Sequence, residues 1–276
     1  MRIVLIGAGA VAESLLVAMS EAGVVPVALY NRTIARARQL KERYAPSMCV
    51  TDTLTALPKD ADVYLFALSD AALSEVASQM PVTTGVWLHT AAALPCDVFA
   101  PYHDAYGLFY PFNTFTRNFP IQLSNTPLFV EHNGEIARET IYELAQLLGM
   151  NPRKSDVASR TKLHLAAVFA CNFTNHLLAI AEELLADEEN LSFSDLHPLI
   201  AETFRKANML SPREAQSGPA RRHDEATIAK HRELLSNLPG SFTDIYNLLT
   251  ASIEAHYTKG YECYSSRSWF YKGFCL

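Results

Sequence analysis

Along its first half, the chain alternates short hydrophobic runs with stretches in which apolar residues recur every three or four positions. The runs are rich in β-branched residues and predict strands, whereas the stretches have the period of an amphipathic helix. The expected strands cover residues 2–6, 25–30, 63–67, 86–89, 106–109 and 128–131, and the expected helices cover 10–22, 33–44, 71–80 and 135–148. This alternation is typical of βαβ units, so we predict an α/β fold with a parallel sheet.

The pattern changes after residue 151, where the alternation of strands and helices stops. Residues 155–186 predict one long helix, because its large side chains follow the 3.6-residue period: Leu165, Phe169, Phe173 and His176. Further helices are expected at 194–209, 224–236 and 242–257. We therefore predict a sheet domain over 1–151 and an all-α domain over 152–276. The aromatic segment 258–276 keeps no period, which leaves a docked tail and a disordered tail as alternatives.

Composition and charge narrow the class of partner. Hydrophobic residues make up 49% of the chain and charged residues 19%, as in an ordinary globular protein rather than a disordered or fibrous one. The formal net charge of −6 provides no basic footprint for nucleic acid or for an anionic membrane. We expect a small-molecule substrate as the partner, and neither nucleic acid nor membrane.

The apolar N-terminus resembles a secretory signal, but two features argue against that interpretation. Glu13 interrupts the run, and Gly7 and Gly9 have the spacing of a nucleotide-binding turn. No later segment reaches the roughly 18 uncharged apolar residues of a membrane helix. The five cysteines are scattered and include no C-x-x-C pair, which is unlike a disulfide framework. We therefore expect a cytoplasmic protein in a reducing compartment.

The segment IVLIGAGAVAESL has the order strand, G-x-G-x-x-A, helix. Gly7 permits the tight turn, Gly9 lets a pyrophosphate approach the backbone, and Ala12 replaces the third glycine where the helix packs on the strand. Amide groups at the start of the helix, at Ala10 and Val11, add their N–H donors and the helix dipole. The pattern predicts a Rossmann-type dinucleotide-binding domain. A glycine-rich turn that binds nothing is the alternative.

The end of the second predicted strand indicates which dinucleotide is bound. An NAD site normally has an acidic residue there on the ribose 2′-OH, but this chain has Asn31 and Arg32, roughly 20 residues past the turn. Without the acid there is no repulsion with a 2′-phosphate, and Arg32 can add a charge-assisted hydrogen bond. Thr33 can cap the next helix, and Arg36 follows one turn later. We predict NADP as the cofactor, with solvated side chains at Arg32 and Arg36 as the alternative.

Several segments line up in order with one family: GAGAVA, NRT, DVYLFALSD, HTAAALP, GLFYPFNTF, KLHLAAVFACNFTNHLLA and SGPARRHDEATIAKH. Together they resemble the Rossmann-like NADP oxidoreductases that carry a DUF2520 helical domain, a family related to pyrroline-5-carboxylate reductases and 6-phosphogluconate-type dehydrogenases. The resemblance implies an NADP-binding domain, a helical domain that forms a homodimer, and an active cleft between the two. It leaves the substrate undefined. Two departures from the family pattern are HTAAA, in place of the more usual H-T-S-G-S, and Tyr110, where many members have His before the proline.

Ligands of open α/β sheets bind at the carboxyl ends of the strands. Five residues that follow the strands at 63–67 and 86–89 are therefore expected to line the cofactor site: Leu68, Ser69, Asp70, His89 and Thr90. His89 and Thr90 should lie near the nicotinamide or its ribose. For Asp70, a helix N-cap is the alternative.

Hydride transfer to a carbonyl or imine also needs a proton source. On the long helix, the polar residues Lys162, His164 and Asn172 interrupt the apolar pattern, and the last two lie about 80° apart around an ideal helix. We expect His164 to donate the proton and Asn172 to bind the substrate oxygen or the nicotinamide amide. Tyr110 would orient the substrate or act as a substitute donor, and Lys162 completes the candidate catalytic set. The alternative for His164 is a satisfied interior histidine.

These features predict an NADP-dependent oxidoreductase that acts on a C=O or C=N group of a small metabolite. The alternative, which the two departures from the family pattern keep open, is a catalytically silent NADP-binding or sensing protein. The nine histidines show no familiar ligand spacing, so no metal is expected.

Overall fold

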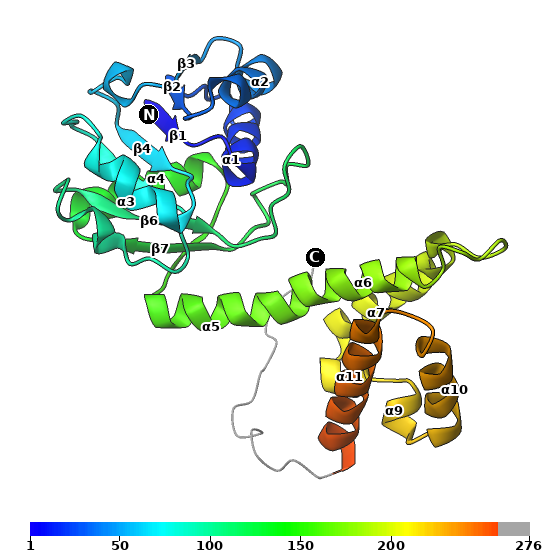
Figure 1. Ribbon diagram of the computed structural model, residues 1–276. Helices are drawn as coiled ribbons and strands as arrows, with labels where there is room; N and C mark the ends of the chain where they lie inside the picture. Colours follow the sequence, from blue (N-terminus) through cyan, green and yellow to red (C-terminus); the bar gives the residue numbers. More distant parts are fainter. Residues whose placement is uncertain (259–276) are drawn as a thin grey trace. The chain divides into compact units, whose positions relative to one another are not determined.

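The computed structural model describes residues 1–258 (Figure 1). The chain forms two compact units, Met1–Phe173 and a second that begins at Thr174. A docked tail and a disordered tail were the alternatives for residues 258–276. Except for Thr258, these residues lie outside the described part of the chain.

An eight-stranded sheet forms the centre of the first unit, with the order β3-β2-β1-β4-β5-β6-β7-β8. The strands are β1 (Ile3–Ile6), β2 (Ala28–Tyr30), β3 (Cys49–Thr51), β4 (Val63–Phe66), β5 (Val86–His89), β6 (Tyr106–Pro111), β7 (Leu128–His132) and β8 (Pro152–Lys154). Neighbouring strands of this sheet are parallel except β6 and β7, which are antiparallel. The strand order reverses between β1 and β4, and the carboxyl ends of these strands border the crevice in which such sheets bind ligands. The predicted α/β fold is confirmed, and the sheet expected to be parallel contains one antiparallel pair, β6 and β7.

Both faces of the sheet are covered, so its central strands are buried on two sides. In β1, Ile3 and Leu5 belong to one core and Val4 and Ile6 to the other, because successive side chains of a strand point to opposite faces. This explains why the strands appear in the sequence as continuous apolar runs rather than alternating ones. One face packs against α1 (Ala10–Glu21), α2 (Ile34–Tyr44) and α4 (Glu135–Leu147), and the other against α3 (Asp70–Ser78) and the 3₁₀ helices η1 (Leu54–Ala56) and η2 (Cys96–Phe99).

Two strands were not predicted from the sequence, and both are three-residue strands at the edges of the sheet, β3 and β8. β8 has the sequence Pro-Arg-Lys, and the residues of β3 are at most partly buried, so neither has an apolar run or a clear alternation. Because β8 pairs with β7, the sheet extends beyond residue 151, the predicted end of the first domain. The first compact unit continues to Phe173.

The predicted long helix is present as one continuous run, Val157–Glu183. It consists of α5 (Val157–Ala167), a π-helical segment (Val168–Phe173) and α6 (Thr174–Glu183). The carboxylate of Asp156 caps its start by accepting a hydrogen bond from the Ser159 amide at 2.7 Å. By length and composition alone this helix could cross a membrane, so the expectation that no segment after the N-terminus is long and apolar enough for a membrane helix is wrong. A helix that packs against another protein chain has the same composition.

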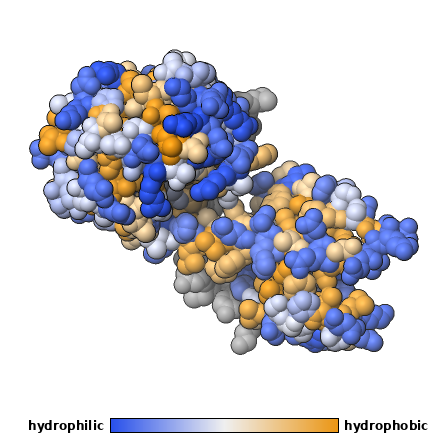
Figure 2. All heavy atoms as spheres, turned by 45° about the horizontal axis from the view of Figure 1, so that its top comes forward, coloured by the Kyte–Doolittle hydropathy of each residue, from blue (hydrophilic) through white to orange (hydrophobic). Residues whose placement is uncertain are grey.

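Helices also make up the rest of the described chain, as predicted. They are η4 (Phe193–Leu196), α7 (His197–Met209), α8 (Pro212–Ala215), α9 (Pro219–Arg222), α10 (Glu225–Leu235) and α11 (Gly240–Thr258). From Thr174 onward, the hydrophobic side chains described as buried are those of Ile180, Ala220, Ile228 and Leu235. Many larger apolar side chains of these helices are exposed, and they gather on the face shown in Figure 2. The core of this unit is therefore small for its length.

Candidate functional site

The turn between β1 and α1 has the backbone that the glycine motif predicts. Gly7 has a φ of +106°, and a Cβ at this position would lie 2.4 Å from the carbonyl oxygen of Ala67, so conformation and space both exclude a side chain. A Cβ at Gly9 would meet nothing within 4 Å, so there is open space in front of the turn. Ala12 is fully buried where α1 packs on the sheet. This turn leaves room for a phosphate group.

Donors for such a phosphate come from the first turn of α1. Gly9 is the N-cap residue and has no side chain with which to cap the helix. The amides of Ala10, Val11 and Ala12 have no preceding helical carbonyl to bond. Free amides and the helix dipole at a helix N-terminus favour an anion, and here they belong to the residues for which the sequence predicts phosphate binding.

Asn31 connects the end of β2 to this turn. Its Oδ1 accepts a hydrogen bond from the Ala8 amide at 3.1 Å, and its Nδ2 donates to the Thr33 carbonyl at 2.8 Å. Thr33 is the N-cap residue of α2, although its side chain makes no capping hydrogen bond. Arg32 lies between them and is exposed at the rim of the turn. Asn31 thus shapes the turn, and Arg32 next to it is exposed to solvent.

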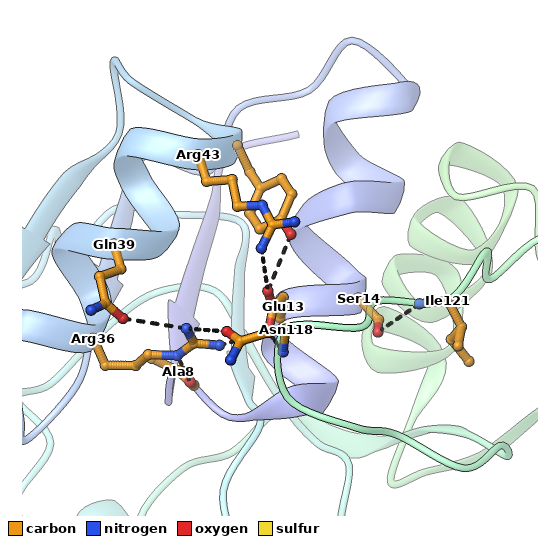
Figure 3. A network of polar contacts seen from close by, with 9 residues as sticks. Ala8, Glu13, Ser14, Arg36, Gln39, Arg43, Asn118 and Ile121 are labelled. Atoms are coloured by element: carbon orange, nitrogen blue, oxygen red, sulfur yellow. Dashed lines mark hydrogen bonds and ion pairs between the residues drawn. The ribbon is translucent and has the colours of Figure 1, made fainter.

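Arg36 has a different environment from Arg32, with only 21% of its side chain exposed. One of its terminal nitrogens, Nη2, donates to Glu13 Oε2 at 2.6 Å, and the other, Nη1, donates to Asn118 Oδ1 at 3.0 Å (Figure 3). Its Nε donates to the carbonyl of Ala8 at 3.4 Å. The solvated side chain that was the alternative for Arg36 is therefore not observed. The guanidinium is instead part of the structure around the turn.

The segment after β4 begins α3 one residue earlier than expected. Ser69 is the N-cap residue, so Asp70 is the first residue of the helix. The N-cap role that was the alternative for Asp70 is not observed, and Ser69 makes no side-chain capping bond. Both side chains are exposed, and Leu68 is partly buried. Ser69 and Asp70 therefore remain accessible to a ligand at the carboxyl edge of the sheet.

His89 ends β5, but its side chain belongs to the core. The ring is 0% exposed and lies edge-on to Phe99, with 5.4 Å between ring centroids. Its Nδ1 accepts a hydrogen bond from the Ala91 amide at 3.3 Å. Burial lowers the pKa of His89 to about 4, so the imidazole is neutral near pH 7. Thr90 is also buried, so the loop after β5 is the part of this strand end that can face a ligand.

Arg160, which was not among the predicted site residues, fixes that loop. Its side chain is fully buried, and its Nε and Nη2 donate to the carbonyl oxygens of Ala92 and Leu94, both at 3.0 Å. Its Nη1 donates to Glu131 Oε2 at 2.7 Å. One guanidinium thus joins α5 to β7 and to the HTAAALP loop. A lone arginine on a helix is ordinarily solvated, so the sequence carried no signal for this role.

Tyr110 lies near the end of β6 within a group of aromatic rings. Its ring is 6.0 Å from that of Phe112 and 6.5 Å from that of Phe129, measured between centroids. Burial raises the pKa of Tyr110, and the Asp70 carboxylate acts in the same direction while the Arg160 guanidinium opposes it. The phenol is therefore protonated near pH 7. It can donate a hydrogen bond, but it is a weaker acid than a free tyrosine.

His164 lies one turn after Arg160 on the same face of α5. Arg160 directs that face toward the loop after β5, and His164 is exposed on it, unlike the interior histidine that was the alternative. Lys162 is about 200° around the helix from His164, so α5 does not bring these two side chains together. No hydrogen bond or ring contact joins His164 to Tyr110 among the described residues.

Asn172 belongs to the π-helical segment, which the sequence pattern did not predict. A π-helix advances by a smaller angle per residue than an α-helix, so the offset of about 80° expected between His164 and Asn172 becomes smaller. The two exposed side chains therefore lie nearer to one face than an ideal α-helix would place them. Single π-turns of this kind occur often at functional sites. Across residues 1–258, no cluster of three His, Cys, Asp or Glu side chains could hold a metal ion.

Two family models match the chain. Residues 1–92 match the shikimate / quinate 5-dehydrogenase family, and residues 126–253 match a domain of unknown function, DUF2520. A search of the curated proteins finds no match.

Solved structures resemble the chain over nearly its whole length. A Bacteroides fragilis protein described as a putative NADP oxidoreductase is 35% identical, with a TM-score of 0.84, and the match covers 92% of this chain and 98% of that protein. A reductive aminase from Aspergillus terreus, in complex with NADPH and ethyl-5-oxohexanoate, is 14% identical, with 94% of each chain covered and a TM-score of 0.69. A pyrroline-5-carboxylate reductase from Coxiella burnetii is 13% identical, covering 93% of this chain and 97% of that one, with a TM-score of 0.53. The last two resemblances concern the fold alone.

Proposed function

The chain belongs to the family of Rossmann-type NADP oxidoreductases that carry a DUF2520 helical domain, and from this membership we propose a specific activity. The protein transfers hydride between NADP(H) and a C=O or C=N group of a small metabolite. The observation that carries the proposal is the open anion-binding turn at Gly9, with the exposed Arg32 at its rim. Bound NADPH would supply the hydride.

The residues around the turn fit the parts of the cofactor. The pyrophosphate would accept hydrogen bonds from the first amides of α1, at Ala10 and Val11. Arg32 would bind the 2′-phosphate by a charge-assisted hydrogen bond. The accessible Ser69 and the loop after β5 would line the nicotinamide part of the cofactor site. Ser69 follows β4 and the loop follows β5, and ligands of such sheets bind at the carboxyl ends of the strands.

The proton would come from His164. Its ring is exposed on the face of α5 that Arg160 directs toward the loop after β5, and histidine is the side chain that most often transfers a proton in enzymes. Asn172, brought nearer to that face by the π-turn, would hold the substrate oxygen or the nicotinamide amide. Tyr110 would orient the substrate through its phenol O–H. We assign Lys162 no direct step, since it faces the other side of α5.

Replacing Arg32 with alanine should weaken NADPH binding about tenfold or more and leave NADH binding nearly unchanged. The lost charge-assisted bond contributes roughly 1.5–3 kcal/mol. Calorimetric titration of wild type and variant with both cofactors measures this. Arg38, another exposed arginine near the start of α2, is the matched control, and its replacement by alanine should change neither affinity. Equal wild-type affinities for NADPH and NADH, both unaffected by Arg32→Ala, would contradict the assignment of NADP.

A catalytically silent NADP-binding protein is the second candidate function. It is favoured by Tyr110, whose raised pKa makes it a poor substitute for the histidine common in the family. The two functions are distinguished by mixing the protein and NADPH with a panel of keto acids, imines and aldehydes. The oxidation of NADPH is measured by its absorbance. Turnover with any compound of the panel supports the enzyme, and tight NADPH binding without turnover supports the silent protein.

We also propose that the protein is a cytoplasmic homodimer joined through its helical domain. The small core after Thr174 leaves an apolar hollow of about 310 Å³ among α6, α9, α10 and α11. Along the long helix, Leu165 and Phe173 are 59% and 50% exposed. Apolar surface of this extent is usually covered by a partner, and a second copy is the commonest one. The free thiols of Cys49, Cys96 and Cys171 support a reducing compartment.

Light scattering after size exclusion should give a mass twice the 30.6 kDa of the chain at micromolar concentration. Leu165→Glu places a charge among the exposed apolar side chains of the long helix and should shift the protein toward monomer. Val82→Glu is the control, because Val82 is 91% exposed and does not belong to the helical domain. A monomeric wild type, or wild-type protein recovered with membranes, would count against this assembly.

A further inference from the structure

Hydrogen bonds hold the peptide groups on both sides of Ala8, one of them from Arg36 of the polar cluster around Glu13 (Figure 3). The N–H of Ala8 donates to Asn31, and the carbonyl of Ala8 accepts from Nε of Arg36 at 3.4 Å. In a trans peptide the C=O and N–H groups point in opposite directions. The Gly9 N–H, which shares its peptide with the Ala8 carbonyl, therefore points away from Arg36. That orientation makes it available to a ligand in front of the turn.

Arg36 owes its position to Glu13. The Glu13 side chain is only 1% exposed, and its Oε2 accepts both the 2.6 Å bond from Arg36 and a 2.9 Å bond from the Asn118 amide. Its Oε1 accepts from the Tyr44 hydroxyl at 3.1 Å and lies 3.7 Å from the Arg43 guanidinium. A buried carboxylate persists only when it is paired and hydrogen-bonded, and such pairs are weak evidence for stability as such. The cluster is therefore better explained by what it holds in place.

We propose that Glu13 and Arg36 are positioning residues for the pyrophosphate-binding turn. Arg36 holds the Ala8–Gly9 peptide so that the Gly9 N–H faces the phosphates, and Glu13 holds Arg36. This inference rests on the proposed NADP function. Since NADPH and NADH have the same pyrophosphate, Glu13 and Arg36 strengthen the binding of both cofactors to the same extent. Arg32, by contrast, acts on the 2′-phosphate alone.

Three ligands separate these roles in calorimetric or competition titrations: NADPH, NADH and adenosine 2′-monophosphate, which has the 2′-phosphate but no pyrophosphate. Glu13→Gln and Arg36→Met should each weaken NADPH and NADH about tenfold, the loss expected for a hydrogen bond to a charged ligand. The ratio of the two affinities and the affinity for adenosine 2′-monophosphate should stay within about twofold of wild type. The double variant should lose no more than Arg36→Met alone, because Glu13 acts through Arg36.

Two further variants keep the test decisive. Arg36→Lys retains a cation beside Glu13 but lacks the Nε–H that contacts Ala8, so it should fold and still weaken both cofactors. Ser14→Ala is the control, because the Ser14 hydroxyl accepts a bond from the Ile121 amide at 3.3 Å and does not contact the turn. It should leave all three affinities unchanged.

The possible outcomes distinguish this inference from the proposed function. If Arg36→Met loses the binding of NADPH and adenosine 2′-monophosphate but keeps that of NADH, Arg36 contacts the 2′-phosphate. If Arg36→Lys binds all three ligands as the wild type does, Glu13 and Arg36 have no positioning role. Either result overturns the inference. A wild-type protein that binds neither cofactor contradicts the proposed function instead.

Discussion

His164→Ala should slow the chemical step by about 10²–10⁴ while leaving NADPH affinity nearly unchanged, because general acid catalysis contributes about that much and none of the proposed cofactor contacts involves His164. The measurement is the single-turnover oxidation of NADPH with the most reactive compound of the carbonyl and imine panel, together with an NADPH titration of the same variant. The expected signature is a lower rate constant with unchanged cofactor binding.

His176→Ala is the matched control, since His176 is an exposed histidine further along the same continuous helix. Its removal should have little effect on the chemical step. Tyr110→Phe should reduce the rate less than His164→Ala, because a phenol with a raised pKa is the poorer acid near neutral pH. If turnover survives His164→Ala and is lost in Tyr110→Phe, the two assignments must be exchanged.

The sheet could be predicted from the sequence because its central strands are buried on both faces. Burial makes each strand a continuous apolar run, as in the fully buried β1 and β4, and the glycine motif then gives the position of the first turn. The edge strands β3 and β8 escaped prediction for the opposite reason. Each has three residues, and their stability comes from pairing with β2 and β7 rather than from a hydrophobic pattern of their own.

The candidate site could be predicted only in part, because its cofactor motif is local and its supporting contacts are not. Gly7, Gly9 and Asn31 lie within one βαβ unit, so spacing alone locates them. Asn118, in contrast, meets Glu13 across a separation of 105 residues. The sequence also does not show which of two nearby arginines is solvated. Arg32 is exposed, whereas Arg36 is held by α1 and by the segment that contains Asn118.

Arg160→Met should lower the free energy of unfolding by about 3–5 kcal/mol, the usual cost of removing one partner of a buried ion pair. The substitution leaves the Glu131 carboxylate without its 2.7 Å partner and removes the donors to the Ala92 and Leu94 carbonyls. Glu131 is 28% exposed, so water should compensate part of the loss and place it toward the lower end of that range. Urea denaturation followed by tryptophan fluorescence, to which the buried Trp87 of the same sheet contributes, measures the change.

The matched control is Arg205→Met, because Arg205 and Glu202 have the same 2.7 Å separation but side chains that are 56% and 41% exposed. Solvent screens that pair, so its removal should leave the denaturation midpoint unchanged. Arg160→Lys is intermediate, since one ammonium group can reach Glu131 but cannot also serve the two carbonyls as a planar guanidinium does. Similar small losses in Arg160→Met and Arg205→Met would show that burial adds nothing to the Arg160 contacts. A large loss at Arg160 alone would mean that the position of the loop after β5, and with it the nicotinamide end of the proposed site, depends on one side chain from α5.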